Sequence, residues 1–186
     1  MTERIVIAIS GQHGSGKTTY AKAVARELGL RYVSAGDFFR EIAKERGMSL
    51  EELNKLAERS DKLDRMIDER TKKEAKKGGV VLDGLLAAWM AGDLADIKIY
   101  VKASDEERYR RLAKRDGLSF EEAKRQTKIR EESERRRFKE YYGIDIDDLS
   151  IYDLVIDSTR LSKEACVKII LDFIEGLRWE HGHKHR

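Results

Sequence analysis

The stretch Ile5-Val-Ile-Ala-Ile9-Ser-Gly11-Gln-His-Gly-Ser-Gly16-Lys17-Thr18 decides the fold. It starts with a nearly continuous apolar run, which is typical of a strand buried on both faces of a parallel sheet. A glycine-rich loop follows, and from Lys17 to Leu28 apolar residues recur at helical spacing. The chain is therefore expected to open with a strand, a tight loop and a helix in direct succession.

The loop itself matches the pattern Gly-x-x-x-x-Gly-Lys-Thr. Glycines let the backbone curl so that its N–H groups surround phosphate oxygens, and the helix that follows adds the positive end of its dipole. We expect Lys17 to contact the β- and γ-phosphates of a nucleoside triphosphate and the Thr18 hydroxyl to bind Mg²⁺. The residues expected to bind the nucleotide are Gly11, Gln12, His13, Gly14, Ser15, Gly16, Lys17, Thr18 and Thr19.

The rest of the chain alternates short apolar runs with charged helical patterns. This alternation predicts an α/β protein of the P-loop NTPase type, in which helices cover both faces of a five-stranded parallel sheet in three layers. Ser49, Ser104 and Ser119 are each followed three residues later by glutamate, which predicts capping boxes at three helix starts. Strands are predicted at 5–9, 31–33, 80–82, 97–101 and 154–156, and helices at 17–28, 37–47, 53–77 and 163–177, with two more opening at 104 and 119.

The chain is predicted to form one domain over residues 1–180. A polar helical insert is expected at about 37–77 and a short lid at about 116–140, while the polar tail 181–186 is expected to be disordered.

Composition weighs against several classes of protein. The chain has 186 residues, of which 39% are charged, yet its formal net charge is only +3, so a nucleic-acid binder is not favoured. No run approaches the roughly 18 apolar residues that span a membrane. The single cysteine, Cys166, lies in an apolar run, and we expect it to be buried. We expect a cytoplasmic monomer that does not bind a membrane.

Asp83 closes the predicted strand Val80–Leu82. A carboxylate at the C-terminal end of such a strand faces the crevice where phosphates bind, so Asp83 is a candidate to hold Mg²⁺ through water. The alternative is a solvated turn aspartate. A guanine-specific Asn-Lys-x-Asp motif is absent from the sequence, which weighs against a GTPase switch.

Four further segments make the chain resemble the nucleoside monophosphate kinases, most closely the archaeal type of cytidylate kinase. The resemblance covers about residues 4–175. The segments are Ser34-Ala-Gly-Asp37-Phe-Phe-Arg40, Lys44-Glu-Arg-Gly-Met-Ser-Leu50, Arg130-Glu-Glu-Ser-Glu-Arg135 and Tyr142-Gly-Ile-Asp-Ile-Asp-Asp-Leu-Ser-Ile-Tyr-Asp153.

The resemblance implies roles for individual residues. In this family the helical insert binds the acceptor nucleotide, and lid arginines neutralise the charge of the transferred phosphoryl group. Asp64 and Asp68 lie four residues apart on one helical face, where they either meet the acceptor base or sugar or are simply solvated. The implied acceptor-binding residues are Ser34, Gly36, Asp37, Arg40, Asp64, Asp68, Gly84, Arg130 and Arg137. The implied catalytic residues are Lys17, Asp83, Arg130 and Arg135, and Arg111 and Arg115 are the implied donor contacts.

The chain departs from the family pattern in two places. Leu85 stands where the archaeal cytidylate kinases usually have an arginine at the acceptor site, and a leucine binds neither a phosphate nor a polar base edge. Gln12-His13 replaces the usual Pro-Pro of the phosphate loop, where the backbone matters more than the side chain.

The leading hypothesis is Mg²⁺- and ATP-dependent phosphorylation of CMP and dCMP. The alternatives are a kinase of AMP, UMP or another small molecule, and a nucleotide sensor or ATPase without an acceptor. Base choice and the preference for ATP over GTP stay open at this point, because both depend on pocket contacts that motifs do not specify.

Overall fold

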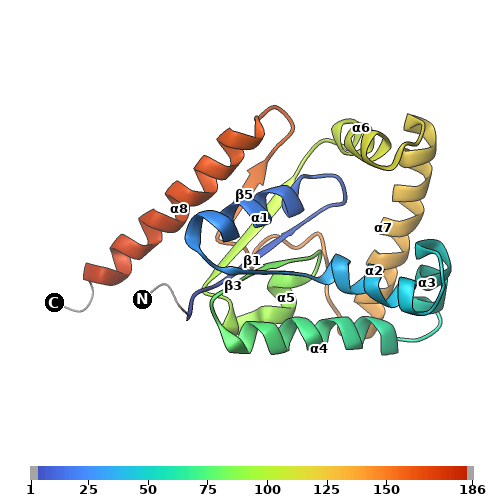
Figure 1. Ribbon diagram of the computed structural model, residues 1–186, viewed down its shortest axis with the longest axis horizontal. Helices are drawn as coiled ribbons and strands as arrows, with labels where there is room; N and C mark the ends of the chain where they lie inside the picture. The colour runs from blue at the N-terminus through green and yellow to red at the C-terminus, as the bar shows by residue number, and fades with distance from the viewer. Residues whose placement is uncertain (1–3, 184–186) are drawn as a thin grey trace.

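A central parallel sheet organises the chain in the computed structural model, which describes residues 4–183 (Figure 1). The strand order is β2-β3-β1-β4-β5, and every neighbouring pair is parallel. The predicted five-stranded parallel sheet is confirmed. The strands are β1 (Val6–Gly11), β2 (Arg31–Ser34), β3 (Val80–Asp83), β4 (Ile97–Lys102) and β5 (Leu154–Asp157).

Helices cover both faces of this sheet and extend beyond one end of it (Figure 1). They are α1 (Lys17–Leu28), α2 (Ala35–Glu45), α3 (Leu50–Ala57), α4 (Lys62–Lys77), α5 (Ala87–Ala91), the 3₁₀ turn η2 (Gly92–Leu94), α6 (Asp105–Asp116), α7 (Phe120–Tyr142) and α8 (Lys163–His183).

The strand β1 shows why the layers form. Ile7 and Ile9 are fully buried in a cluster with side chains of α1 and α8, whereas Val6 and Ala8 are buried in a second cluster with α4 and α5. Successive side chains of a strand point to opposite faces, so an apolar run is required when both faces are covered. Cys166 lies buried in the first cluster, as predicted.

The helices α2, α3 and α4 form a small subdomain with a core of its own. Leu53 and Ala57 of α3 are fully buried there against Ile42 of α2 and Ile67 of α4. At the end of the molecule away from the termini, α3 lies beside α7 (Figure 1). The Tyr141 hydroxyl of α7 donates a hydrogen bond to the carbonyl of Ala57 over 3.1 Å, which ties the two elements together.

Serine hydroxyls cap the three helix starts at which the sequence predicts capping boxes. At Ser49 both bonds of a capping box with Glu52 are present. The hydroxyls of Ser104 and Ser119 accept the backbone N–H groups of Glu107 and Glu122, respectively. These caps explain why helices with so many charged residues begin at defined positions.

The structure corrects the predicted boundaries in four places. The helix predicted over 53–77 is two helices, α3 and α4, because the chain turns at Ser60 and Asp61, whose side chains bond Lys62 N–H and the Arg65 guanidinium. The helix expected from residue 37 already begins at Ala35, with Ser34 as its cap. The short helix α5 and the turn η2 were not predicted.

The fourth correction concerns the end of the chain. The last helix was expected to stop near residue 177, but α8 continues to His183. Residues 181–183 of the expected disordered tail therefore belong to a helix, and 184–186 lie outside the described residues. Within residues 4–183, no helix has the length and apolar character needed to cross a membrane.

Candidate active site

The phosphate loop links β1 to α1 and depends on glycine at defined points. Gly14 has φ 78°, and a Cβ there would lie 2.6 Å from the carbonyl oxygen of Arg108. Gly11 has φ 153°, and a Cβ there would lie 2.1 Å from the carbonyl oxygen of Val101. Any larger residue would thus displace the loop from the neighbouring β4 and α6.

Lys17 lies at the end of this loop. Its Nζ donates to the carbonyl of Gln12 over 3.3 Å, which turns the side chain back over the loop. Burial lowers the pKa of the Lys17 ammonium, and the charge of Asp83 partly opposes this effect. A buried ammonium favours an anionic ligand, which restores the interactions that water no longer supplies.

Asp83 is 2% exposed and meets two hydroxyl groups. Its Oδ2 accepts hydrogen bonds from Thr18 Oγ1 and from the Tyr32 hydroxyl, each over 2.7 Å. Burial, followed by the nearby Asp83 charge, raises the pKa of Tyr32, so its phenol stays a donor. Asp83 Oδ1 is buried and has no hydrogen-bond partner among the described residues. An orphaned carboxylate oxygen beside a threonine hydroxyl offers hard oxygen ligands, and this donor set fits Mg²⁺ or its bound water.

Two arginines of α6 donate hydrogen bonds to backbone carbonyls of the phosphate loop. Arg111 Nη1 donates to the carbonyl of Ser15 over 3.1 Å, and its Nη2 donates to the carbonyl of Ser158 over 2.9 Å. Arg108 is almost fully buried and donates to the carbonyl of His13 and to Glu131 of α7. Arg108 therefore connects the loop to α6 and α7.

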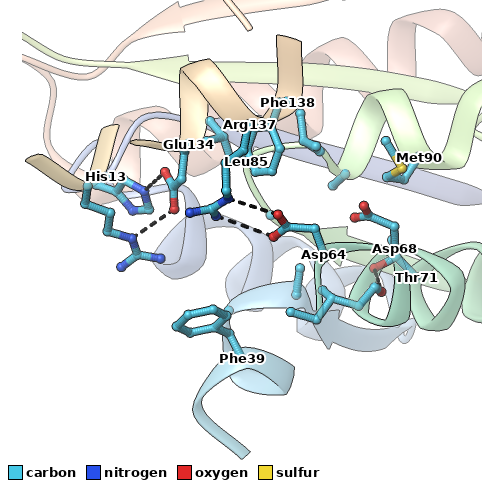
Figure 2. Close-up of a pocket in the computed structure, with 17 residues that line it drawn as sticks. His13, Phe39, Asp64, Asp68, Thr71, Leu85, Met90, Glu134, Arg137 and Phe138 are labelled. Atoms are coloured by element: carbon cyan, nitrogen blue, oxygen red, sulfur yellow. Dashed lines mark hydrogen bonds and ion pairs between the residues drawn. The ribbon is translucent and has the colours of Figure 1, made fainter. Parts of the chain in front are cut away.

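A second connection runs through the side chain of His13. Its Nε2 lies 2.7 Å from Glu134 Oε2, and Arg130 Nε donates to the other oxygen of Glu134 over 2.9 Å (Figure 2). Burial, reinforced by the charge of Arg130, lowers the pKa of His13 to about 4. Burial alone would raise the pKa of Glu134, but the charges of His13 and Arg130 hold it well below its ordinary value. The group is a neutral imidazole that donates to an ionised carboxylate.

A cavity opens between these groups and the α2–α4 subdomain (Figure 2). The lining includes the apolar side chains of Phe39, Leu85, Leu86, Met90 and Phe138. It also includes the polar or charged side chains of Asp64, Asp68, Thr71, Arg130, Glu134 and Arg137. His13 and Gly84 also line the cavity, so it adjoins both the phosphate loop and the end of β3.

Arg137 and Asp64 form a buried ion pair in the cavity lining. Arg137 Nε donates to Asp64 Oδ2 over 3.0 Å, and both side chains are less than a tenth exposed (Figure 2). The Arg137 Nη1 donates to Asn54 Oδ1 and Ser133 Oγ, each over 2.9 Å. Burial raises the pKa of Asp64, although Arg137 opposes it. The pair fixes α4 against α7 across the cavity.

Asp68 lies one turn further along α4, and its partner is neutral. It is 8% exposed, and it accepts a hydrogen bond from the Tyr142 hydroxyl. Burial raises the pKa of Asp68 to about 6, and the charge of Asp64 adds to this rise. Asp64 and Asp68 are therefore buried cavity groups, and the alternative that they are solvated is wrong.

Residues 6–160 match the cytidylate kinase-like family. The chain belongs to this family. It is 54% identical over 171 residues to a cytidylate kinase of Staphylothermus marinus, covering 92% of this chain and 97% of the relative. A cytidylate kinase of Methanopyrus kandleri is 46% identical over 182 residues, covering 93% of this chain and 94% of the relative. The family resemblance inferred from the motifs is confirmed.

Solved structures agree on the fold. A gluconokinase from Sinorhizobium meliloti gives a TM-score of 0.64 at 13% identity, covering 99% of each chain. A shikimate kinase from Acinetobacter baumannii, in complex with shikimate, gives 0.60 at 16% identity, covering 93% of this chain and 94% of the other. At such identities the likeness concerns the fold alone, and it confirms the prediction of a P-loop kinase fold.

The structure gathers many of the residues that the family resemblance implied. Gly36, Asp64, Asp68, Gly84, Arg130 and Arg137 all line the cavity. Ser34 is buried as the cap of α2, with its hydroxyl bonded to the N–H of Asp37. Their roles toward a ligand remain predictions.

Other implied residues lie outside the cavity lining. Arg40 pairs with Asp37 over 2.5 Å on the exposed side of α2. Arg135 pairs with Asp147 over 3.1 Å, and Arg115 pairs with its neighbour Asp116. Thr19 is exposed. These four residues are partly or mostly solvated here, so the geometry lends their predicted roles no direct support.

Among the site residues that sequence reasoning missed are three that bond to predicted site residues. Tyr32 bonds Asp83, Glu134 joins the phosphate loop to α7, and Tyr142 bonds Asp68. Tyr142 and Glu134 lie inside two of the quoted family segments, which was an available signal. Tyr32 lies two residues before Ser34, on the same face of β2, and this alternation would have pointed toward the site.

Proposed function

We propose that this protein transfers the γ-phosphate of ATP to CMP or dCMP in the presence of Mg²⁺. The observation that carries this proposal is the cavity, which adjoins the phosphate loop at His13 and is lined by three buried carboxylates and one buried guanidinium. We propose further that the protein acts as a cytoplasmic monomer on this small-molecule acceptor.

Phosphoryl transfer needs positioning and charge stabilisation more than covalent chemistry. In the proposed reaction Lys17 binds the β- and γ-phosphates of ATP, and Arg130 offsets charge on the transferred γ-phosphoryl group. Thr18 and Asp83 would hold Mg²⁺, which supplies further positive charge at the β- and γ-phosphates. Glu134 orients Arg130 through its 2.9 Å bond. The cavity walls exclude water, which would otherwise compete with the acceptor for the phosphoryl group.

The polar groups of the cavity lining suit cytosine. The base has an exocyclic amino group, which donates hydrogen bonds, next to a ring nitrogen and a carbonyl, which accept them. Asp64 and Asp68 supply acceptors, and Arg137 supplies donors. Uracil would bring a carbonyl oxygen where cytosine has its amino group, and that oxygen would face a carboxylate. Leu85, Met90 and Phe138 then pack against the apolar faces of the nucleoside.

A coupled assay of ADP release tests the proposal. Purified full chain with Mg-ATP is offered CMP, dCMP, UMP, AMP, GMP and no acceptor in turn. We expect strong stimulation by CMP and dCMP only. Stimulation by another monophosphate would keep the reaction but refute the assignment of the base. ADP release that is indifferent to every acceptor would refute the kinase and leave an ATPase or sensor.

A further inference from the structure

The carboxylate of Asp83 is held in an asymmetric way. Both of its hydrogen bonds end on Oδ2, from Thr18 and from Tyr32 at 2.7 Å each. Oδ1 is buried without a hydrogen-bond partner within the described part of the chain. A carboxylate with one saturated oxygen and one open oxygen is oriented toward a ligand on its open side.

The sheet explains how Tyr32 reaches this carboxylate. β2 pairs with β3 in a register that places Ser34 opposite Asp83. Tyr32 precedes Ser34 by two residues, so its side chain projects from the same face of β2. The half-buried ring packs against the core cluster of α1 and α8, and Lys22 Nζ lies 5.3 Å from its centroid. Packing of the ring therefore restricts the rotation of the Tyr32 side chain and holds its hydroxyl next to Asp83.

We propose that Tyr32 is the positioning residue for the metal-binding carboxylate of this enzyme. Its hydroxyl fixes the rotation of the Asp83 side chain, so that Oδ1 stays directed at Mg²⁺ or a water bound to it. Thr18 alone does not fix this rotation, because a carboxylate held by one hydrogen bond can still turn about that contact. The Thr18 oxygen is also itself expected to bind the metal. The inference rests on the proposed Mg²⁺ site at Thr18 and Asp83.

The test compares Tyr32→Phe with the wild type and with Tyr100→Phe. Tyr32→Phe removes the hydroxyl and keeps the ring. Tyr100 is another tyrosine of the sheet, buried, and its ring packs on Tyr152 with 5.0 Å between centroids, which makes it a control for loss of a tyrosine hydroxyl. Calorimetry measures the affinity for ATP with Mg²⁺ and with a chelator, and the Mg²⁺ concentration for half-maximal rate is measured separately.

We expect Tyr32→Phe to weaken the Mg²⁺-dependent part of ATP affinity about 10-fold, at the lower end of what such supporting contacts contribute. The half-maximal Mg²⁺ concentration should rise by a similar factor, while ATP affinity in chelator and the KM for CMP stay unchanged. Tyr100→Phe should match the wild type in all four measurements.

Two results would overturn the inference. Equal metal dependence in Tyr32→Phe and wild type would show that the hydroxyl does not position Asp83. An equal loss of affinity with and without Mg²⁺ would assign Tyr32 a purely structural role, and a melting curve of each variant identifies that case. A wild type whose ATP affinity does not depend on Mg²⁺ would refute the proposed Mg²⁺ site itself. This outcome is distinguishable from the other two because it does not involve the variant.

Discussion

Asp68 is expected to lower the stability of the folded protein at neutral pH. It is 8% exposed, and its partner is the neutral hydroxyl of Tyr142 rather than a cation. Burial raises its pKa from 3.8 to about 6. A carboxyl group that binds its proton more tightly when folded destabilises the fold once it is ionised. Asp68→Asn keeps the shape and the bond from Tyr142 and removes this charge.

The magnitude follows from the pKa. The rise from 3.8 to about 6 corresponds to about 3 kcal/mol of unfolding free energy at pH values above both. Below pH 3.8 the aspartate is protonated in both states and resembles asparagine, so the variant and the wild type should be equally stable there. The advantage of Asp68→Asn should grow between pH 4 and pH 6 and then stay constant. At pH 7.5 it should raise Tm by about 6–12 °C for a chain of this length.

Urea unfolding at a series of pH values measures this difference directly. Glu69→Gln removes a charge from the exposed side of the same helix and serves as the control, with no change expected beyond about 0.5 kcal/mol. The reasoning is refuted if Asp68→Asn shows the same pH dependence as the wild type, or if it is less stable at pH 7.5. Under the proposed function the variant should also use CMP less well, because one acceptor for the base is weakened.

Three further variants test other parts of the site. Lys17→Ala should abolish phosphoryl transfer while the melting temperature stays within a few degrees of the wild type; wild-type turnover would refute the phosphate-loop role. Arg137→Met should leave Asp64 buried and unpaired, which costs about 3–5 kcal/mol at pH 7.5 in urea unfolding. This deficit should shrink at lower pH as Asp64 takes up a proton, and a pH-independent deficit would count against the ion pair. Leu85→Arg should lower the KM for CMP and leave the KM for ATP unchanged, as measured in the coupled assay; a higher KM for CMP would show that the apolar wall is required.

Local patterns were enough to predict the unit that carries the phosphate loop. An apolar run, three glycines and a helical apolar period lie within residues 5–28, and the helix predicted over 17–28 has those bounds in the structure. The serine caps were predictable for the same reason, since Ser49 and Glu52 interact within one turn. Patterns of this kind need no information about distant parts of the chain.

The partners of charged residues were not predictable from such patterns. Arg108 and Arg115 lie on the same charged helix, yet one is almost fully buried against the phosphate loop and the other is exposed. Nothing local distinguishes them, because burial of Arg108 depends on Glu131 of α7 and on the carbonyl of His13. The break between α3 and α4 was missed because the polar pattern continues across Ser60 and Asp61 with the same helical character.

The central claim is that the γ-phosphate of ATP passes directly to a cytidine monophosphate. The most direct test follows ATP labelled in its γ-phosphate, mixed with Mg²⁺, CMP and the purified chain, and separates the products. The account predicts that the label appears in CDP, and that replacing CMP with UMP removes most of this product. Label found only in inorganic phosphate, at the same rate with and without CMP, would contradict it.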